Sequence, residues 1–436
     1  MRAWSLIAGS VVLSGVLVAF ALPPHGWSPL GWVVYVPLLM AVKKRGFAVG
    51  FTAALLSTLF AAWVDAQGFL LPRGTEDATS DWIYAGFLLF GLVASFVTGL
   101  FAGSERFQMH PYRCAAFAVF FEGMLLFYLP AHLALTQSRS TVLLYVASWV
   151  GIWGVSYLLW YVNFWIARDG WRRAWILIPA MLSSSSWLPA EKGTLPIAMI
   201  QSQSYELAAL NKRATEMGAE VAVWPELAAT SDVDKIAEAP NQCAFVTSRE
   251  EPGELKPFNV AHVFSELGES IGYKKRKPFA GESQTHASGD RAIVVPYNGI
   301  NYGLIICFDS CFPKVVRDTA RLRDVQVILI PTLDPNTTSG VAQSIHAAYT
   351  PFRAAEFGVP MVRTDASGYS MAVDSHGRVI TELRNDQDAI RIAYVKPGKR
   401  WTLITLWDDW FMFACMGIIV VTWMPLKRRK AQEVKE

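Results

Sequence analysis

Three stretches of the sequence carry residues that could perform acyl-transfer chemistry together. The run "NYGLIICFDSC" places Cys307 directly after apolar residues that are typical of a buried strand. The run "VAVWPE" ends on Glu226, and Pro225 fixes the backbone just before that carboxylate. The run "YKKRKPFAGE" sets four basic residues between Tyr273 and Glu282. Together they offer a thiol, a carboxylate and an ammonium group.

A thiol needs such neighbours before it can act as a nucleophile. Near its reference pKa of about 8.5 it is mostly protonated at neutral pH. A carboxylate can take the proton as general base, and a lysine can stabilise both thiolate and oxyanion. Each residue also has a simpler interpretation: a buried cysteine packs as a small hydrophobe, and a charge run is usually solvated or faces lipid head groups. The combination predicts acyl transfer with Glu226 as base, Lys275 as electrophilic stabiliser and Cys307 as nucleophile.

The choice of lysine follows from the geometry of an extended segment. Side chains alternate along a strand, so Tyr273 and Lys275 share one face. Lys274 and Arg276 are then expected to face the solvent or lipid head groups. The choice of cysteine follows from position, because Cys307 ends the apolar run and Cys311 precedes a Phe-Pro pair. We therefore expect Cys311 to serve in packing.

Composition shows what surrounds these residues. The 436-residue chain is 53% hydrophobic and only 17% charged, against roughly a quarter charged in soluble proteins. The net charge of +3 and the absence of a basic stripe interleaved with aromatics argue against nucleic-acid binding. The five cysteines form no metal-ligand pattern with histidines, so no metal and no cofactor are expected.

The apolar runs predict a polytopic helical membrane protein. A bilayer crossing needs about 20 apolar residues, and we predict about eight spans: Trp4–Leu22, Trp27–Val42, Phe47–Ala66, Trp82–Ala102, Cys114–Leu135, Val142–Ala167, Ala174–Leu188 and Leu403–Met424. With a cytoplasmic N-terminus, thirteen basic residues fall on the cytoplasmic side: Arg2, Lys43, Lys44, Arg45, Arg106, Arg113, Arg168, Arg172, Arg173, Lys427, Arg428, Arg429 and Lys430. The short outer loops carry only Arg73 and Arg139. This asymmetry follows the positive-inside rule and places the stretch from about 190 to 400 outside the cytoplasm.

That polar stretch predicts an α/β domain. Short β-branched runs such as "LPIAMIQ" and "VQVILIP" alternate with helical patterns such as Pro313–Leu322 and Ser344–Phe357. We therefore divide the chain into a transmembrane bundle (1–190), a catalytic domain (191–400) and a C-terminal helix with a basic tail (401–436).

The order Glu226, Lys275, Cys307 resembles the carbon–nitrogen hydrolase (nitrilase) superfamily. Its motifs are matched by "WPE", "YKK" and "GLIICFDSCFP", and its late helix by "HAAYTPFRAAEFGVP". The resemblance implies an αββα sandwich with a Glu-Lys-Cys triad. It also implies supporting roles for Tyr273, Glu282, Phe308 and Asp309, with Glu282 orienting the lysine or the base.

The layout of the whole chain is similar to that of the bacterial apolipoprotein N-acyltransferase family. The early "LPPHGWSPLGWVVYVPLL" is similar to that family's first periplasmic turn and second helix. The resemblance implies a phospholipid acyl donor, the N-terminal amine of a diacylglyceryl-cysteine lipoprotein as acceptor, and a thioester intermediate. It further implies a monomer in the bacterial inner membrane with its catalytic domain in the periplasm.

Two departures from the family pattern leave alternatives open. Phe308-Asp309 stands where the family usually has Tyr-Glu, and the lysine motif is one residue shorter, so counting back from Glu282 would select Lys274. Loops after Glu226 are also short. A membrane-anchored amidase or hydrolase, or an acyltransferase for another amine, is the alternative. A non-catalytic transporter or scaffold is a third, against which the intact triad weighs.

Overall fold

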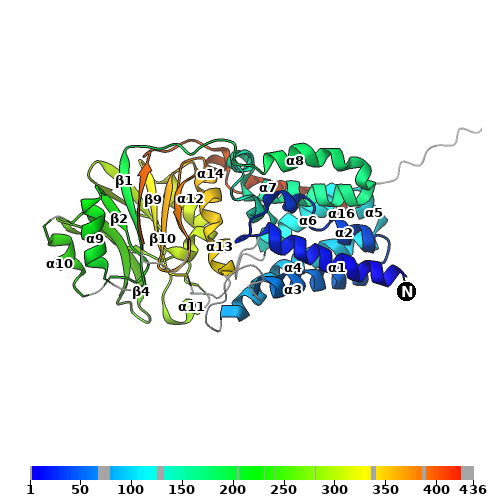
Figure 1. The fold of residues 1–436 in the computed structure, drawn as a ribbon, viewed down its shortest axis with the longest axis horizontal. Coiled ribbons are helices and arrows are strands. Elements are labelled where there is room, and N and C mark those ends of the chain that lie inside the picture. The colour runs from blue at the N-terminus through cyan, green and yellow to red at the C-terminus, as the bar shows by residue number, and fades with distance from the viewer. Residues whose placement is uncertain are drawn as a thin grey trace, which may run out of the picture.

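A helix bundle and an α/β sandwich lie side by side in the computed structural model of the chain (Figure 1). The structure describes residues 2–66, 79–124, 132–203, 206–229, 231–240, 242–279, 281–334, 340–384 and 389–423. The long axis of the bundle helices points towards the sandwich, and the helices α12 to α14 of the sandwich stand closest to the bundle (Figure 1).

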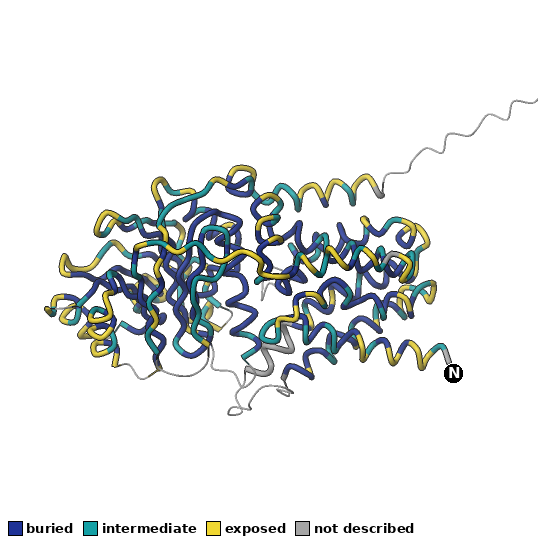
Figure 2. The backbone as a smooth tube through the Cα atoms, turned by 45° about the horizontal axis from the view of Figure 1, so that its top comes forward, coloured by how far each residue is buried: buried dark blue, intermediate teal, exposed yellow. Residues whose placement is uncertain are grey.

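The bundle is built from apolar helices of very unequal length. Its elements are α1 (Arg2–Ala21), η1 (Ser28–Trp32), α2 (Val36–Val42), α3 (Phe47–Ala66), α4 (Thr79–Gly103), α5 (Glu105–Met109), α6 (Pro111–Met124), η2 (Leu133–Gln137), α7 (Thr141–Asp169), η3 (Trp171–Ile176), α8 (Leu177–Ser183), α15 (Leu403–Trp407) and α16 (Trp410–Trp423). Exposed residues recur along α1 and α16 (Figure 2), and large apolar residues such as Trp4, Leu6, Phe413 and Val421 are among them. Such exposure is typical of helices solvated by lipid.

Three of the described helices are long and apolar enough to cross a membrane: Ala3–Ala21, Phe47–Asp65 and Thr141–Asp169. A fourth predicted span, Trp82–Ala102, lies within the continuous helix α4. Three others are not continuous helices. Trp27–Val42 is a 3₁₀ turn followed by a short helix, Ala174–Leu188 contains a seven-residue helix, and the last span is broken at Asp408, whose φ is 57°. Hydropathy measures the length of an apolar run and does not detect such breaks in a helix. Part of Cys114–Leu135, and Met424 with the basic tail, lie outside the described residues.

Contacts at the two ends of the bundle group the loops between the predicted spans. At the end away from the sandwich, Lys43 Nζ donates to the Arg168 carbonyl at 2.7 Å, and Arg168 donates to the Met109 carbonyl at 3.2 Å. These residues belong to three predicted cytoplasmic loops. At the other end Arg139, from a predicted outer loop, pairs with Glu382 of the sandwich at 2.5 Å. The contacts agree with the predicted grouping of loops.

Two sheets stack face to face in the sandwich. The first has the order β13-β1-β2-β3-β4-β5, with β6 also paired to β4; the second has the order β12-β11-β10-β9-β8-β7. The strands of the first sheet are β1 (Leu195–Gln201), β2 (Val221–Val223), β3 (Ala244–Glu251), β4 (Phe258–Ser265), β5 (Gly268–Glu269), β6 (Tyr273–Lys274) and β13 (Ala389–Val395). Those of the second are β7 (Val294–Tyr297), β8 (Ile300–Leu304), β9 (Val327–Thr332), β10 (Met361–Asp365), β11 (Ser370–Val373) and β12 (Val379–Leu383).

Helices cover both outer faces, which confirms the predicted αββα sandwich. Along β1, Ile197 and Met199 belong to the core between the sheets, whereas Ala198 and Ile200 belong to the cluster under the outer helices. This alternation follows from the two-residue period of a strand. The helices on the first sheet are α9 (Leu207–Glu216) and α10 (Val233–Glu238); those on the second are α12 (Pro313–Arg321), α13 (Val341–Ala347) and α14 (Tyr349–Phe357) (Figure 1). A short helix, α11 (Glu282–Thr285), lies at the strand ends.

Parallel neighbours in both sheets direct their carboxyl ends to one edge. β1 pairs with β2 in parallel, and β8, β9 and β10 are parallel to one another. Loops at such an edge are where α/β folds gather functional side chains. Glu226 follows β2, and Cys307 follows β8. The topology therefore brings together residues 81 positions apart in the chain.

Candidate active site

Glu226, Lys275 and Glu282 form one hydrogen-bonded group at the sandwich edge. Lys275 Nζ lies 2.7 Å from Glu226 Oε1 and 2.5 Å from Glu282 Oε2. Asn259 of β4 donates through Nδ2 to Glu226 at 2.7 Å and to Glu282 at 3.0 Å. The second Glu226 oxygen accepts from the Leu333 backbone N–H at 3.0 Å. Glu226 is thus held on both oxygens.

The lysine ammonium is kept charged by its neighbours. Burial lowers the pKa of Lys275, but the charges of Glu226, Cys307 and Glu282 and the hydrogen bond to Glu226 outweigh burial and raise it above its ordinary value. Burial likewise raises the pKa of the Glu282 carboxyl, and Lys275 and Asn259 more than reverse this, so the net shift is downward. An ammonium between two carboxylates is the arrangement that opposite charges favour.

Cys307 begins a 3₁₀ turn at the third position after the end of β8, instead of ending the strand as expected. Its φ of 46° is in the left-handed region, which is uncommon for residues other than glycine and is seen at constrained functional turns. The thiol is buried, and Sγ lies 4.0 Å from Asp334 Oδ1. Burial raises the thiol pKa well above its usual value, Glu226 and Asp334 add to the rise, and Lys275 and Arg363 oppose it.

The structure separates the two candidate lysines as the alternation of an extended segment predicts. Tyr273 and Lys275 are buried, whereas Lys274 is exposed and its Nζ sits 4.0 Å from the centre of the Phe258 ring. The geometric expectation for Lys275 is met, and its role in the reaction stays a prediction. The expectation for Arg276 is wrong, because its side chain is partly buried and pairs with Asp318 at 2.7 Å.

Asp309 joins the nucleophile turn to the lysine loop. Its carboxylate accepts from the Tyr273 hydroxyl at 2.8 Å, the Lys277 backbone N–H at 2.7 Å and the Ile306 backbone N–H at 3.2 Å. Burial raises its pKa to about 6, although the Tyr273 hydroxyl and Lys275 act in the other direction. Asp309 therefore fixes two loops against each other.

Phe308 has a packing position beside the thiol. Its ring meets the rings of Phe279 and Phe312 edge to face, each with centroids 5.0 Å apart. This chain departs from the usual motif at positions 308 and 309. Phe308 thus packs against other aromatic rings, and Asp309 holds two loops together.

Sequence reasoning missed a polar network on the other side of Cys307. His346 Nδ1 lies 2.6 Å from Asp334 Oδ1, and His346 Nε2 lies 3.1 Å from the Cys307 carbonyl oxygen. Arg363 pairs with Asp334 and, at 3.1 Å, with Asp365. Burial and the nearby guanidinium lower the pKa of His346 well below its usual value, so the imidazole is neutral. A polar residue closely following the apolar strand "VQVILIPT" was the available signal for Asp334.

Three of these side chains could in principle hold a metal ion. Ligand atoms of Cys307, Asp334 and His346 all lie within 4.8 Å of one another. However, the Arg363 guanidinium already binds Asp334 and lies 3.3 Å from His346 Nδ1. Both ring nitrogens of His346 are also engaged, Nδ1 with Asp334 at 2.6 Å and Nε2 with the Ser310 hydroxyl at 3.1 Å. The imidazole therefore has no free nitrogen to offer as a ligand, and we assign no metal to this cluster.

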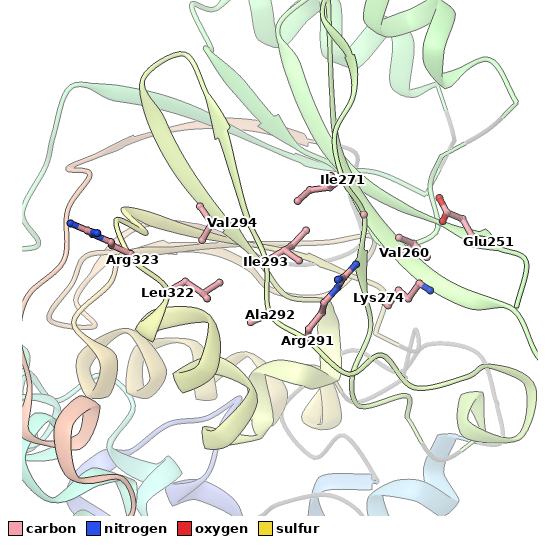
Figure 3. Close-up of a pocket in the computed structure, with 11 residues that line it drawn as sticks. Glu251, Val260, Ile271, Lys274, Arg291, Ala292, Ile293, Val294, Leu322 and Arg323 are labelled. Carbon is pink, nitrogen blue, oxygen red and sulfur yellow. The ribbon is translucent and has the colours of Figure 1, made fainter.

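Two cavities lie near these elements. A pocket of about 450 Å³ opens beside the group and is lined in part by Glu226 and Asp334. A larger groove of about 780 Å³ lies at another edge of the sandwich, lined by Lys274, Arg291, Arg323, Glu251 and apolar side chains (Figure 3). Lys274 thus belongs to the groove and Glu226 to the pocket.

Comparison with known proteins agrees with this geometry. An αββα sandwich with buried glutamate, lysine and cysteine at one edge defines an enzyme of the carbon–nitrogen hydrolase class, and the carbon–nitrogen hydrolase family model matches residues 194–400. The model of the apolipoprotein N-acyltransferase N-terminal domain matches residues 14–165. The chain therefore belongs to the apolipoprotein N-acyltransferase family.

Individual relatives differ in how much they share. The apolipoprotein N-acyltransferase of Geobacter metallireducens is 26% identical over 96% of this chain and 95% of its own length. An (R)-stereoselective amidase from Pseudomonas sp. is 29% identical over 30% of this chain and 49% of that protein. The solved amidase of Nesterenkonia sp. AN1 is 19% identical, with a TM-score of 0.42 over 50% of this chain and 99% of that one.

Proposed function

We propose that the chain transfers an acyl chain from a membrane phospholipid to the N-terminal amine of a diacylglyceryl-cysteine lipoprotein. The observation that carries this proposal is the Glu226–Lys275 ion pair beside the buried Cys307, in a sandwich whose helices pack directly on an apolar bundle. The chemistry is acyl transfer through a thioester, and both substrates are lipid-anchored, so a bundle that holds the site at the membrane serves the reaction.

The first half of the reaction loads the enzyme. Glu226 takes the proton of the Cys307 thiol, and the thiolate attacks the ester carbonyl of the phospholipid. Lys275, together with backbone N–H groups near Cys307, stabilises the oxyanion. When the tetrahedral intermediate collapses, the glycerol oxygen leaves and receives the proton from Glu226. The products are lysophospholipid and the Cys307 thioester.

The second half transfers the acyl chain. The neutral amine of the acceptor attacks the thioester carbonyl and passes its proton to Glu226. The amide forms as the Cys307 sulfur leaves, and Glu226 returns the proton to the sulfur. Glu282 and Asn259 hold Lys275 and Glu226 in one geometry through both halves.

The raised thiol pKa fits this sequence of steps. Burial keeps the resting thiol protonated, so the proton moves to Glu226 only as the sulfur attacks the bound ester. A pre-formed thiolate beside the Glu226 carboxylate would place two negative charges together in a buried site.

The membrane arrangement completes the proposal. We infer eight crossings with a cytoplasmic N-terminus, a bacterial inner-membrane location, a periplasmic sandwich and a monomeric enzyme. We also keep the division of the chain into a transmembrane bundle (1–190), a catalytic domain (191–400) and a C-terminal helix with a basic tail (401–436). The segregation of Lys43 and Arg168 from Arg139 supports the orientation.

Hydrolysis is the alternative outcome of the same chemistry. The local similarity to an (R)-stereoselective amidase supports this alternative. Water in place of the amine would turn the enzyme into a membrane-anchored hydrolase. The geometry of Glu226, Lys275 and Cys307 serves either acceptor.

Complementation separates these outcomes. The chain is expressed in a strain depleted of lipoprotein N-acylation, and the N-terminus of a lipoprotein is analysed by mass spectrometry. We expect a third acyl chain with the wild type and none with Cys307→Ala. A wild-type chain that releases fatty acid from phospholipid and leaves the lipoprotein amine free would contradict the proposal and support the hydrolase.

A further inference from the structure

A pocket beside Glu226 is built from the carboxyl ends of four strands. Residues that follow β1, β2, β9 and β10 line it, and its volume is about 450 Å³. Its polar lining comes from Ser202, Gln203, Glu226, Asp334 and Ser367. Among the described residues that line it there are two carboxylates and neither lysine nor arginine. The pocket is therefore suited to a cation.

The first pair of carboxylates shares a single cation. Glu226 and Glu282 both contact the ammonium of Lys275, at 2.7 and 2.5 Å. One positive charge thus serves two negative ones, which leaves a formal charge of −1 on this side of the thiol.

The second pair repeats the pattern on the opposite side. Asp334 and Asp365 both contact the Arg363 guanidinium, and the neighbouring His346 is neutral because burial lowers its pKa. Burial and the charge of Asp334 raise the pKa of Asp365 to about 7, so this carboxyl is partly protonated at neutral pH and up to one further negative charge remains. Buried charges that lack a full partner are costly unless a proton or a cation compensates them.

Asp334 is placed between this excess charge and the nucleophile. Its Oδ1 lies 4.0 Å from Cys307 Sγ, and the same residue lines the pocket. A cation in the pocket that contacted Asp334 would stand next to an acyl group carried by Cys307. A phosphate would add negative charge and would be repelled.

We infer that this pocket is the subsite for the ammonium group of the acyl acceptor, with Asp334 as the carboxylate that binds it. The inference rests on the proposed function, because it specifies the acceptor side of the same reaction. The acceptor is a primary amine that arrives protonated, such as the N-terminus of a peptide.

Asp334 also provides a route for the first proton. An ammonium must lose one proton before its nitrogen can attack. That proton passes to the Asp334 carboxylate, which yields neutral amine and a carboxylic acid. The amine attacks the thioester and gives its second proton to Glu226, while Asp334 later returns its proton to water in the pocket. Burial and the charge of Glu226 raise the pKa of Asp334, even though Arg363 opposes them, which makes this carboxyl a better proton acceptor.

The test isolates the second half-reaction. Full-length enzyme is first loaded from a phospholipid with a labelled acyl chain, and the thioester is then offered two nucleophiles. One is a diacylglyceryl-cysteinyl peptide with a free N-terminal amine, which is cationic at neutral pH. The other is hydroxylamine, which is uncharged at neutral pH. The KM of each nucleophile is measured.

Two substitutions alter the charge of the pocket. Asp334→Asn removes the carboxylate, and Leu333→Lys adds a cation at a pocket wall where the side chain is 43% exposed. We expect each to raise the KM of the peptide at least about tenfold, as for loss of one charge-assisted hydrogen bond. The KM of hydroxylamine should change by less than about twofold. Leu255→Lys, at a position that is 97% exposed and outside the pocket, is the matched control and should change neither.

The outcomes separate this inference from the proposed function. If no thioester forms on the wild-type enzyme, the proposed function fails. If the thioester forms but the peptide KM of folded Asp334→Asn is unchanged, only the acceptor subsite is overturned. The same holds if the KM values of the peptide and of hydroxylamine rise by the same factor. If Asp334→Asn does not fold, an unchanged peptide KM in Leu333→Lys overturns it instead.

Discussion

Glu356 of the sandwich helix α14 accepts a hydrogen bond at 2.6 Å from the backbone N–H of Ile152 in the bundle helix α7. The helix is broken there, since Gly151 has a φ of 68° and a ψ of 179°. The break leaves the Ile152 N–H without a helical partner, and the carboxylate supplies one. Arg353 pairs with Glu356 and donates to the Cys311 carbonyl at 2.8 Å. A single chain of contacts thus joins the bundle to the turn that begins with Cys307.

We therefore predict that Glu356→Ala strongly destabilises the protein. Removing one member of a buried pair leaves Arg353 uncompensated, at a cost of roughly 3–5 kcal/mol. Thermal unfolding in detergent should show a clear fall in Tm. The control is Glu382→Ala, which breaks the partly exposed pair with Arg139 and should cost no more than about 1 kcal/mol. An equal fall in Tm in both variants would contradict the prediction that the Glu356 contacts contribute more to stability than the Arg139–Glu382 pair.

Cys307→Ala is expected to abolish the thioester, because no other described thiol is close to Glu226 and Lys275. Cys311 is fully buried, and burial raises its pKa above the ordinary range. Cys311→Ala should therefore keep most of the thioester formation and lose some stability through packing. Acyl transfer from labelled phospholipid, followed by mass spectrometry of the modified peptide, measures both. An acyl group trapped on Cys311 would reverse the assignment.

Lys275→Ala should lower turnover by roughly a hundred- to a thousand-fold, the usual effect of losing an oxyanion donor. It also leaves Glu226 and Glu282 without their shared cation. Lys274→Ala, on the opposite face of the same segment, should change turnover by less than about threefold. Steady-state rates of phospholipid-dependent acylation measure the two side by side. A large loss in Lys274→Ala alone would mean that the alternation argument selected the wrong lysine.

Asp309 should give the protein a characteristic pH dependence of stability. Its pKa is raised from 3.8 to about 6 in the folded state, so the folded protein holds this proton more tightly than the unfolded chain. The stabilising contribution is fully present below the unfolded value and is lost as pH rises from about 4 to about 6. Asp309→Asn cannot titrate, so the wild-type Tm should fall relative to that of Asp309→Asn across this window. A constant difference in Tm between pH 4 and pH 6.5 would exclude the raised pKa.

The position of a site residue could be predicted from the sequence where that residue follows a strand or lies within an extended segment. Glu226 and Cys307 follow apolar strands, and parallel strands end at the same edge, so their proximity could be inferred. Lys275 followed from the alternation of side chains with Tyr273. Asn259 also follows this rule, since it is a polar residue on the inward face of β4, and attention to that face would have found it.

Other features depend on contacts between distant elements. His346 reaches Cys307 only because α13 packs on the second sheet, and no local pattern encodes that approach. In the bundle, the breaks at Gly151 and Asp408 are stabilised by side chains from elsewhere. Glu356 satisfies the first, and Arg317 binds Asp408 and Asp409 at 3.0 Å around the second. Apolar length alone therefore predicted continuous helices at these two places, where the structure has breaks.

The orientation of the bundle gives a prediction that uses single engineered cysteines. All five native cysteines are buried, so a membrane-impermeant maleimide should react slowly with the wild-type chain. Lys44 is exposed at the end of the bundle away from the sandwich, and Gln284 is exposed on α11 at the sandwich edge. In intact cells with a permeabilised outer membrane, we expect Gln284→Cys to be labelled and Lys44→Cys to be protected. After disruption of the inner membrane both should react, which controls for accessibility. Labelling of Lys44→Cys in intact cells would place the basic loops outside the cytoplasm, against the positive-inside asymmetry. Protection of both variants would place the sandwich on the cytoplasmic side, where a lipoprotein amine exposed to the periplasm could not reach Cys307.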